Sequence, residues 1–306
     1  MRIDKLIQKK SLPSFCTSNF EVLNSIMYFC HINRLPCLIE CTSNQVNQFG
    51  GYTKITPKKF IKKISNIRKK IKFKKNKLFL GGDHLGPLPW KSSSSKIAIK
   101  NSIKLINSYL KQDFCKIHID TSIKCKDDEK INSNIIFDRT LKILKNNKIK
   151  KGIKNRFIVI GTEVPLSGSG DNKRIVKTSK KQIEDEFFKF KKILKKIKLQ
   201  SKIFALVIEP GMKYMHSRIT GPDFNNFLEK KKFSKKNNFV FEAHSTDYQP
   251  LKILKKLTKN NFKFLKVGPE LTYNYSRSLF FMQNLEEKFS FKKKFRIKNK
   301  ILTTMK

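Results

Sequence analysis

The stretch KLFLGGDHLGP at residues 77–87 shows the pattern that decides the fold, because a short apolar run ends there in glycines and ionisable side chains. Seven further apolar runs recur along the chain, and most of them also end in polar or turn-forming residues. The eight candidate strands are residues 12–18, 36–42, 77–83, 115–120, 156–163, 202–210, 238–245 and 263–270. Short runs rich in Ile, Leu, Val and Phe are typical of strands that are buried on both faces.

Amphipathic helical patterns separate these runs. The helical segments are residues 21–34, 56–72, 95–111, 134–146, 180–199, 221–232 and 249–259. Strict alternation of strand and helix predicts parallel pairing with right-handed crossovers, and eight such units close a (β/α)8 barrel. We therefore expect an α/β fold, with a single TIM-barrel domain at residues 1–285 and a basic tail at residues 286–306.

The formal net charge is +45, and arginine accounts for only nine of the 68 cationic residues. A surface this basic can attract a polyanion, and that is one explanation of the charge. However, lysine is mixed with Ile, Asn and Phe along the whole chain, which is the composition that an A/T-biased coding sequence produces. No nucleic-acid-binding motif accompanies the lysines, so we expect no specific nucleic-acid partner.

The sequence predicts neither a membrane span nor a secreted protein. No uncharged apolar run is long enough to cross a bilayer, and the N-terminal MRIDKLIQKK has no apolar signal region. The basic amphipathic segments at residues 58–77 and 189–202 fit the outer helices of a barrel better than a membrane surface. Six cysteines form no CxxC pair. We expect a cytoplasmic protein with free thiols and no membrane partner.

Ionisable residues recur at the ends of the predicted strands, and in a barrel those ends meet at one mouth. Asp83 and His84 follow one strand, while Glu163 and His244 end two others. Two imidazoles from different strands can share a metal ion, and a carboxylate beside them can move protons. The alternative is that each histidine only completes a hydrogen-bond network with a neighbouring carboxylate.

Zinc at a catalytic site normally takes three protein ligands, so two histidines need a third partner. The candidates for that ligand are Glu163, Glu209 and Glu242. We expect one divalent metal ion, zinc or similar, with His84, His244 and Glu209 as ligands. Asp83 and Glu163 are then the candidate catalytic acid/base groups.

Other strand ends supply candidate substrate-binding residues. His118 and Asp120 lie two apart on one predicted strand and so face the same side. We assign Asp120, nearer the mouth, to the substrate, and His118 to the hydrogen-bonded core. The last two strands of a barrel often place backbone N–H groups against a phosphate. The residues expected there are Ser245, Thr246, Lys266 and Gly268.

Five longer segments are distinctive in sequence. They are ECTSNQVNQFGGYT (40–53), GGDHLGP (81–87), GTEVP (161–165), EAHSTDYQ (242–249) and KVGP (266–269). In this order and spacing they resemble the GatZ/KbaZ family, over roughly residues 10–285. The resemblance implies a barrel related to class II, zinc-type ketose-bisphosphate aldolases. We assign Asn44 and Gln45, in the first segment, to substrate binding.

The resemblance also implies a function. Members of this family are the non-catalytic, accessory subunit of a class II D-tagatose-1,6-bisphosphate aldolase, in galactitol or N-acetylgalactosamine catabolism. The implied partners are a catalytic aldolase subunit and a phosphorylated ketose. Asp83 resembles the proton donor of the catalytic subunit, and His84 and His244 resemble two of its metal ligands.

Where the catalytic subunit has its remaining histidine ligand, this chain reads IEPG at residues 208–211, which fits a non-catalytic role. The resemblance also implies a further C-terminal helical region in family members, which we expect this chain to lack. The alternative function is a metal-dependent C4 epimerase of a ketose 6-phosphate, which would work by retro-aldol chemistry in its own right. A pure scaffold has no need of Asp83, His84, Glu163 and His244 together.

Overall fold

The computed structural model describes residues 2–161, 177–199, 203–214, 219–225, 227–289, 299–300 and 303. The strands of the barrel are β1 (Leu12–Cys16), β2 (Cys37–Thr42), β3 (Leu78–Leu85), β4 (Lys116–Asp120), β5 (Phe157–Gly161), β6 (Phe204–Val207), β9 (Val240–Ala243) and β10 (Phe262–Val267). These eight strands pair in this order, all parallel, and β10 pairs with β1 to close the barrel. Each strand overlaps one predicted segment, so the predicted (β/α)8 fold is confirmed.

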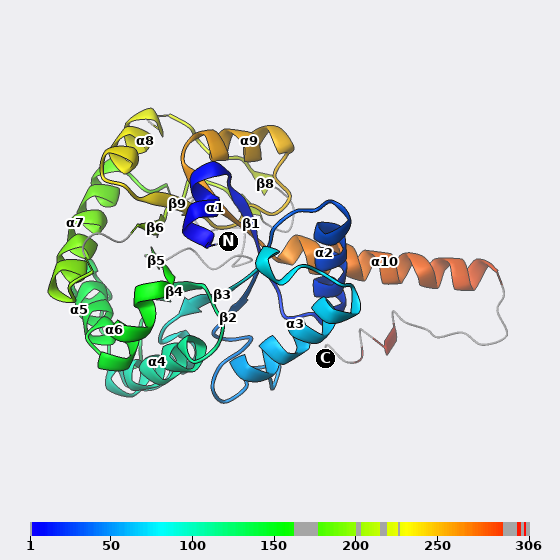
Figure 1. The fold of residues 1–306 in the computed structure, drawn as a ribbon, viewed down its shortest axis with the longest axis horizontal. Coiled ribbons are helices and arrows are strands. Elements are labelled where there is room, and N and C mark those ends of the chain that lie inside the picture. The colour runs from blue at the N-terminus through cyan, green and yellow to red at the C-terminus, as the bar shows by residue number, and fades with distance from the viewer. Residues whose placement is uncertain are drawn as a thin grey trace.

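Helices surround the barrel (Figure 1). Their bounds are α1 (Ile3–Lys9), α2 (Phe20–Ile32), α3 (Pro57–Lys70), α4 (Ser95–Leu110), α5 (Ser133–Leu144), α6 (Asn147–Gly152), α7 (Lys180–Lys196), α8 (Phe227–Lys236), α9 (Leu251–Lys259) and α10 (Pro269–Lys288). Short 3₁₀ helices are η1 (Lys75–Lys77), η2 (Leu88–Trp90) and η3 (Ile153–Asn155), and β7 (Lys213–Tyr214) pairs antiparallel with β8 (Ile219–Thr220) outside the barrel. The sequence patterns did not predict α1, α6 or α10.

Local sequence signals explain where several helices begin. The Asn19 side chain accepts hydrogen bonds from the first backbone N–H groups of α2. Thr56 caps α3, with Pro57 at the first helical position. Ser179 and Gln182 form a reciprocal capping box at the start of α7. Each cap of this kind contributes about 1 kcal/mol and fixes the helix start relative to the preceding strand.

Helix α1 closes the N-terminal end of the barrel. Its buried apolar side chains pack against residues that fill the lower barrel interior. This cluster contains Ile3, Leu6, Ile7, Leu12, Leu38, Phe79, Phe157, Val159, Ala205, Val207 and Phe264. Burying each large side chain stabilises the fold by roughly 2 kcal/mol. The N-terminal half of the interior is therefore apolar, and the polar chemistry is left to the other half.

Helix α10 follows the last barrel strand, touches α2 and extends away from the barrel (Figure 1). Most of its residues are partly or fully exposed, although it is the longest described helix. Among the described residues, no helix combines the length and the hydropathy that crossing a membrane would require.

Candidate functional site

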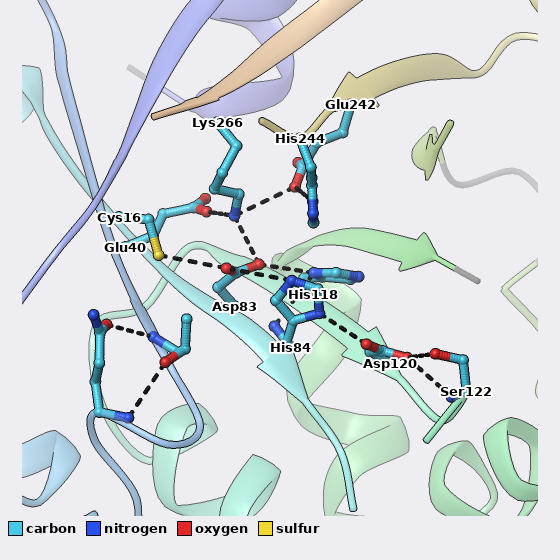
Figure 2. Close-up of polar contacts among 12 residues, drawn as sticks. Cys16, Glu40, Asp83, His84, His118, Asp120, Ser122, Glu242, His244 and Lys266 are labelled. Atoms are coloured by element: carbon cyan, nitrogen blue, oxygen red, sulfur yellow. Dashed lines mark hydrogen bonds and ion pairs between the residues drawn. The ribbon is translucent and has the colours of Figure 1, made fainter. Parts of the chain in front are cut away.

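Three imidazoles and one carboxylate meet at the C-terminal ends of the strands. Asp83 and His84 come from β3, His118 from β4, and His244 directly follows β9. One ligand atom from each lies within 4.8 Å of the others. The centroid of the His84 ring lies 4.7 Å from that of the His118 ring and 5.0 Å from that of the His244 ring. Figure 2 shows these side chains converging inside the barrel mouth.

Each imidazole is held by a carboxylate through one ring nitrogen. His84 Nδ1 lies 2.8 Å from Asp120 Oδ2, and His118 Nδ1 lies 2.8 Å from Asp83 Oδ1. His244 Nε2 lies 3.1 Å from a carboxylate oxygen of Glu242. A carboxylate that fixes one nitrogen of a histidine orients the ring and leaves the other nitrogen for a metal ion.

The second carboxylate oxygen of Asp120 is fixed as well. Its Oδ1 accepts hydrogen bonds from the backbone N–H and the hydroxyl of Ser122, at 2.9 and 2.6 Å. Burial raises the pKa of Asp120, but the hydrogen bond from His84, the charges of His84 and His118 and the bond from the Ser122 hydroxyl outweigh it and hold the pKa well below its usual value. The structure places Asp120, the residue that the sequence assigned to the substrate, in contact with His84.

The three histidines differ in protonation. Burial lowers the pKa of His84, but the charge of Asp83 and the bond to Asp120 outweigh it and raise the pKa to about 9. Burial dominates for His244 and lowers its pKa to about 3, and burial also lowers the pKa of His118. At neutral pH, His84 is therefore a cation, while His118 and His244 are neutral and can offer a lone pair.

Below the imidazoles, two buried lysines neutralise three carboxylates. Lys116 Nζ, which is fully buried, donates to Glu40 at 2.5 Å and lies 2.6 Å from Glu242. Lys266 Nζ bonds Glu40, lies 2.7 Å from Asp83 Oδ1 and lies 3.4 Å from Glu242. Figure 2 shows Lys266 between these carboxylates. The network spans β2, β3, β4, β9 and β10 and so ties opposite sides of the barrel together.

The network favours the charged forms of Asp83 and Lys266. Burial raises the pKa of Asp83, but His84, Lys266 and His118 outweigh it and hold the pKa well below its usual value. Burial likewise opposes the charge on Lys266, yet the charges of Asp83, Glu40 and Glu242 raise its pKa well above its usual value. Asp83 also accepts a hydrogen bond from the Cys16 thiol at 3.4 Å. The carboxylate is therefore saturated with donors and stays ionised at neutral pH.

The two remaining acidic candidates are placed differently. Glu209 follows β6 and is buried, and its Oε1 has no hydrogen-bond partner in the described part of the chain. Burial raises the pKa of Glu209 to about 8, while the charge of His84 lowers it. His118, rather than Glu209, lies with the other histidines in the group of possible ligands. Glu163 lies outside the described residues.

The other expected substrate-binding residues mostly stabilise the loops at the mouth. Gln45 Oε1 accepts from the Thr42 backbone N–H at 2.9 Å, and Asn44 is exposed. The Thr246 hydroxyl donates to the Lys266 carbonyl at 2.6 Å. Ser245, at φ 55°, lies in the left-handed region that few residues other than glycine adopt.

A carboxylate of the protein already occupies the backbone donors expected to bind phosphate. The N–H groups of Gly268 and Glu270, at the start of α10, both donate to Asp247 Oδ1 at 2.9 Å. In return, Glu270 accepts from the Tyr248 N–H at 2.7 Å. This arrangement caps α10, and a phosphate could bind these groups only by displacing Asp247.

His118, Glu40 and Lys116 are parts of the site that the sequence reasoning did not assign to it. His118 was expected to be a core histidine. The signal that could have found it is the alternation KIHID in β4, which directs Lys116, His118 and Asp120 to the same face. Gly161 on the neighbouring strand makes room for this ring, because a Cβ there would lie 2.9 Å from His118 Nε2.

Comparison with solved structures places this geometry among known barrels. A structure described as a probable tagatose 6-phosphate kinase from Sinorhizobium meliloti 1021 has a TM-score of 0.81 and 29% identity, and covers 90% of this chain and 69% of that chain. A fructose-bisphosphate aldolase from Campylobacter jejuni has a TM-score of 0.58 at 12% identity and covers 93% of this chain and 80% of that chain, which shows the shared fold alone.

Sequence comparison is more specific. The D-tagatose-1,6-bisphosphate aldolase subunit GatZ of Escherichia coli O1:K1 is 32% identical over 284 residues, which span 90% of this chain and 67% of that protein. The sequence model of the family described as D-tagatose-1,6-bisphosphate aldolase subunit GatZ/KbaZ-like matches residues 1–306. The family predicted from the five sequence segments is thereby confirmed. This chain belongs to the GatZ/KbaZ-like family of D-tagatose-1,6-bisphosphate aldolase subunits.

Proposed function

We propose that this chain is the accessory subunit of a class II D-tagatose-1,6-bisphosphate aldolase, which it binds, stabilises and activates. The pathway we propose is the catabolism of galactitol or N-acetylgalactosamine through tagatose 6-phosphate. The name of its relatives supports this role, because GatZ is named as a subunit of that aldolase. The name of the solved relative from Sinorhizobium meliloti also refers to a tagatose phosphate, which supports the same substrate class.

The observation that carries the accessory role is the state of Asp83. A general acid needs a pKa near the working pH and access to the group that it protonates. Asp83 is buried, bonded to Lys266, His118 and Cys16, and its pKa is well below its usual value. A carboxylate in this state has no proton to donate at neutral pH. This supports a barrel that keeps an aldolase-like arrangement without turning over the substrate alone.

We further propose that the site holds one divalent metal ion, zinc or a similar one. Three imidazole nitrogens and a carboxylate oxygen form a donor set that suits zinc. His118 Nε2 is buried here and has no hydrogen-bond partner among the residues that the structure describes, and His118 and His244 are neutral at pH 7. His84, His118, His244 and Asp83 would hold the ion, and His84 would lose its proton on binding it. The bound ion would polarise a substrate oxygen.

The substrate class that we propose is a phosphorylated ketose bound at the mouth of the barrel. Lys266 and the N–H groups of Gly268 and Glu270 bond to carboxylates of the protein. Any phosphate contact there requires those carboxylates to move. Asn44 is exposed, so its side chain is open to a ligand from solvent.

Complex formation tests the accessory role. We expect the chain to elute together with a class II tagatose-bisphosphate aldolase catalytic subunit in size-exclusion chromatography, and to lengthen the thermal half-life of that subunit several-fold. The physical reason is that binding to the native state shifts the folding equilibrium by mass action. If the two proteins elute separately at micromolar concentrations and the half-life does not change, the accessory role is wrong.

Metal content tests the proposed ion independently of activity. We expect about one equivalent of zinc in protein that is purified and then dialysed, as measured by mass spectrometry of the metal. His84→Ala and His244→Ala should each lower the affinity at least ten-fold. His31→Ala is the matched control, because His31 lies on α2 and contacts Phe73 instead. Equal metal content in all four proteins would contradict the assignment.

A further inference from the structure

Two neighbouring outer helices, α2 and α10, are poor in lysine, although the rest of the chain is rich in it. Residues 11–53, which include α2, contain no lysine. Residues 267–287 contain none either, and they include all of α10 except its last residue, Lys288. Every other described α-helix carries lysine among its exposed residues. Helices α2 and α10 lie far apart in the sequence but contact each other in the fold (Figure 1).

The contrast with α3, which follows α2 around the barrel, shows how unusual this is. The exposed face of α3 is almost entirely lysine: Lys58, Lys59, Lys62, Lys63, Lys69 and Lys70. A coding bias toward lysine places lysine at exposed positions where any polar residue would be tolerated. The absence of lysine from α2 and from residues 269–287 of α10 therefore indicates that lysine is not tolerated at these surface positions.

The same two helices expose large apolar side chains. On α2 they are Tyr28, Phe29 and Ile32, and on α10 they are Tyr273, Phe281 and Met282. Interfaces between proteins are enriched in aromatic residues and methionine and depleted in lysine, and this face has both properties. We call these six residues and the two helices that carry them the α2–α10 face. An apolar surface of this kind is costly to leave in water unless a partner covers it.

We propose that the α2–α10 face is where two copies of this chain associate. Two molecules of charge +45 repel each other through their lysine-rich surfaces, so they approach most readily where lysine is missing. The charges that remain on α10 are self-complementary, because the exposed Arg277 and Glu287 flank Phe281 and Met282. If two α10 helices pair antiparallel about a two-fold axis, Arg277 of one copy approaches Glu287 of the other. An acidic partner would instead be drawn to the lysine-rich faces.

Sedimentation velocity over a range of concentrations tests this proposal. We expect the wild-type chain to sediment as a species of twice the 35.9 kDa chain mass at micromolar concentration in about 0.15 M salt. Phe281→Glu replaces an exposed aromatic side chain of the face with a carboxylate in both copies, and it should raise the dimer dissociation constant at least ten-fold. Tyr28→Glu, on the other helix, should act in the same direction.

The matched control is Leu228→Glu, because Leu228 on α8 is 60% exposed and Phe281 is 61% exposed. The control should leave the dimer dissociation constant unchanged. In all the variants the monomer should unfold at the same thermal midpoint as the wild-type monomer, which shows that the substitutions do not disturb the fold. A wild-type chain that stays monomeric up to about 100 μM overturns the proposal. So does a dimer that Leu228→Glu weakens as much as Phe281→Glu. If the wild-type chain is monomeric and Phe281→Glu abolishes binding to the catalytic aldolase subunit, the face belongs to that partner and self-association is excluded.

Discussion

Lys266 is the residue on which the buried charges of the barrel depend, because its ammonium group contacts Glu40, Asp83 and Glu242. Lys266→Met removes the positive charge and leaves these carboxylates buried with fewer partners. We expect the free energy of unfolding to fall by about 3–5 kcal/mol, as measured by urea unfolding at pH 7. Lys263→Met on the same strand should change it by less than about 0.5 kcal/mol. Equal losses in the two variants would contradict a special role for Lys266.

Glu209 gives a pH dependence whose sign can be worked out. Its pKa rises from 4.5 to about 8 on folding, because burial disfavours the charged form. Between these values the folded chain holds a proton that the unfolded chain has released. The contribution of Glu209 to stability therefore falls as the pH rises, by about 1.4 kcal/mol per pH unit.

Glu209→Gln removes this titration. In protein freed of metal with a chelator, the stability of the variant relative to the wild type should increase steadily from pH 5 to pH 8. Urea unfolding at each pH measures the difference. Parallel stability curves for the two proteins would mean that Glu209 is solvated and titrates normally.

At the residue scale, the sequence predicted the candidate site in part. Asp83, His84 and His244 were recognised from their place at the strand ends, and the structure brings them together. The partners of Lys266 could not be predicted, because Glu40 lies 226 residues away in the sequence. Pairing across a barrel is set by strand order and register, which local patterns do not contain.

The end of β3 depends on a glycine that lets the chain pass close to β4. A Cβ on Gly86 would lie 1.6 Å from the backbone oxygen of Asp120, so Gly86→Ala must displace one of the two strand ends. We expect a loss of about 1–3 kcal/mol in the free energy of unfolding. Weaker metal binding should accompany it, because Asp120 positions His84.

Gly221→Ala is the control for this substitution, since a Cβ there has no atom within 4 Å. It should leave the free energy of unfolding within about 0.5 kcal/mol of the wild type. Calorimetry or urea unfolding can compare the three proteins. If Gly86→Ala is as stable as Gly221→Ala, the close approach of β3 to β4 is wrong.

At the element scale, strands were easier to predict than terminal helices. All eight barrel strands were predicted because each contains a short cluster of apolar residues, and several of them, such as β5, are buried on both faces. Helix α1 was missed because it has only seven residues, and its apolar side chains stand among charged ones. Helix α10 was missed because it buries little of its surface, and so it lacks the amphipathic pattern of the other outer helices.

For the molecule as a whole, the amino-acid composition describes the surface, and the polar groups at the strand ends bear on the function. The net charge of +45 is spread over most outer helices, and no nucleic-acid-binding motif accompanies it in the sequence. The polar groups at the C-terminal ends of the strands are where barrel enzymes place their chemistry. In this chain the most buried of those groups bond to one another, and this supports a partner subunit over an independent enzyme.

The rate of tagatose 1,6-bisphosphate cleavage tests that conclusion most directly. It should be measured with the catalytic aldolase subunit alone, with this chain alone, and with the two mixed. We predict no cleavage by this chain alone and a rate for the mixture at least several-fold above that of the catalytic subunit. Cleavage of the bisphosphate, or epimerisation of tagatose 6-phosphate, by this chain alone and lost on His84→Ala would contradict the accessory role and make the protein an enzyme in its own right.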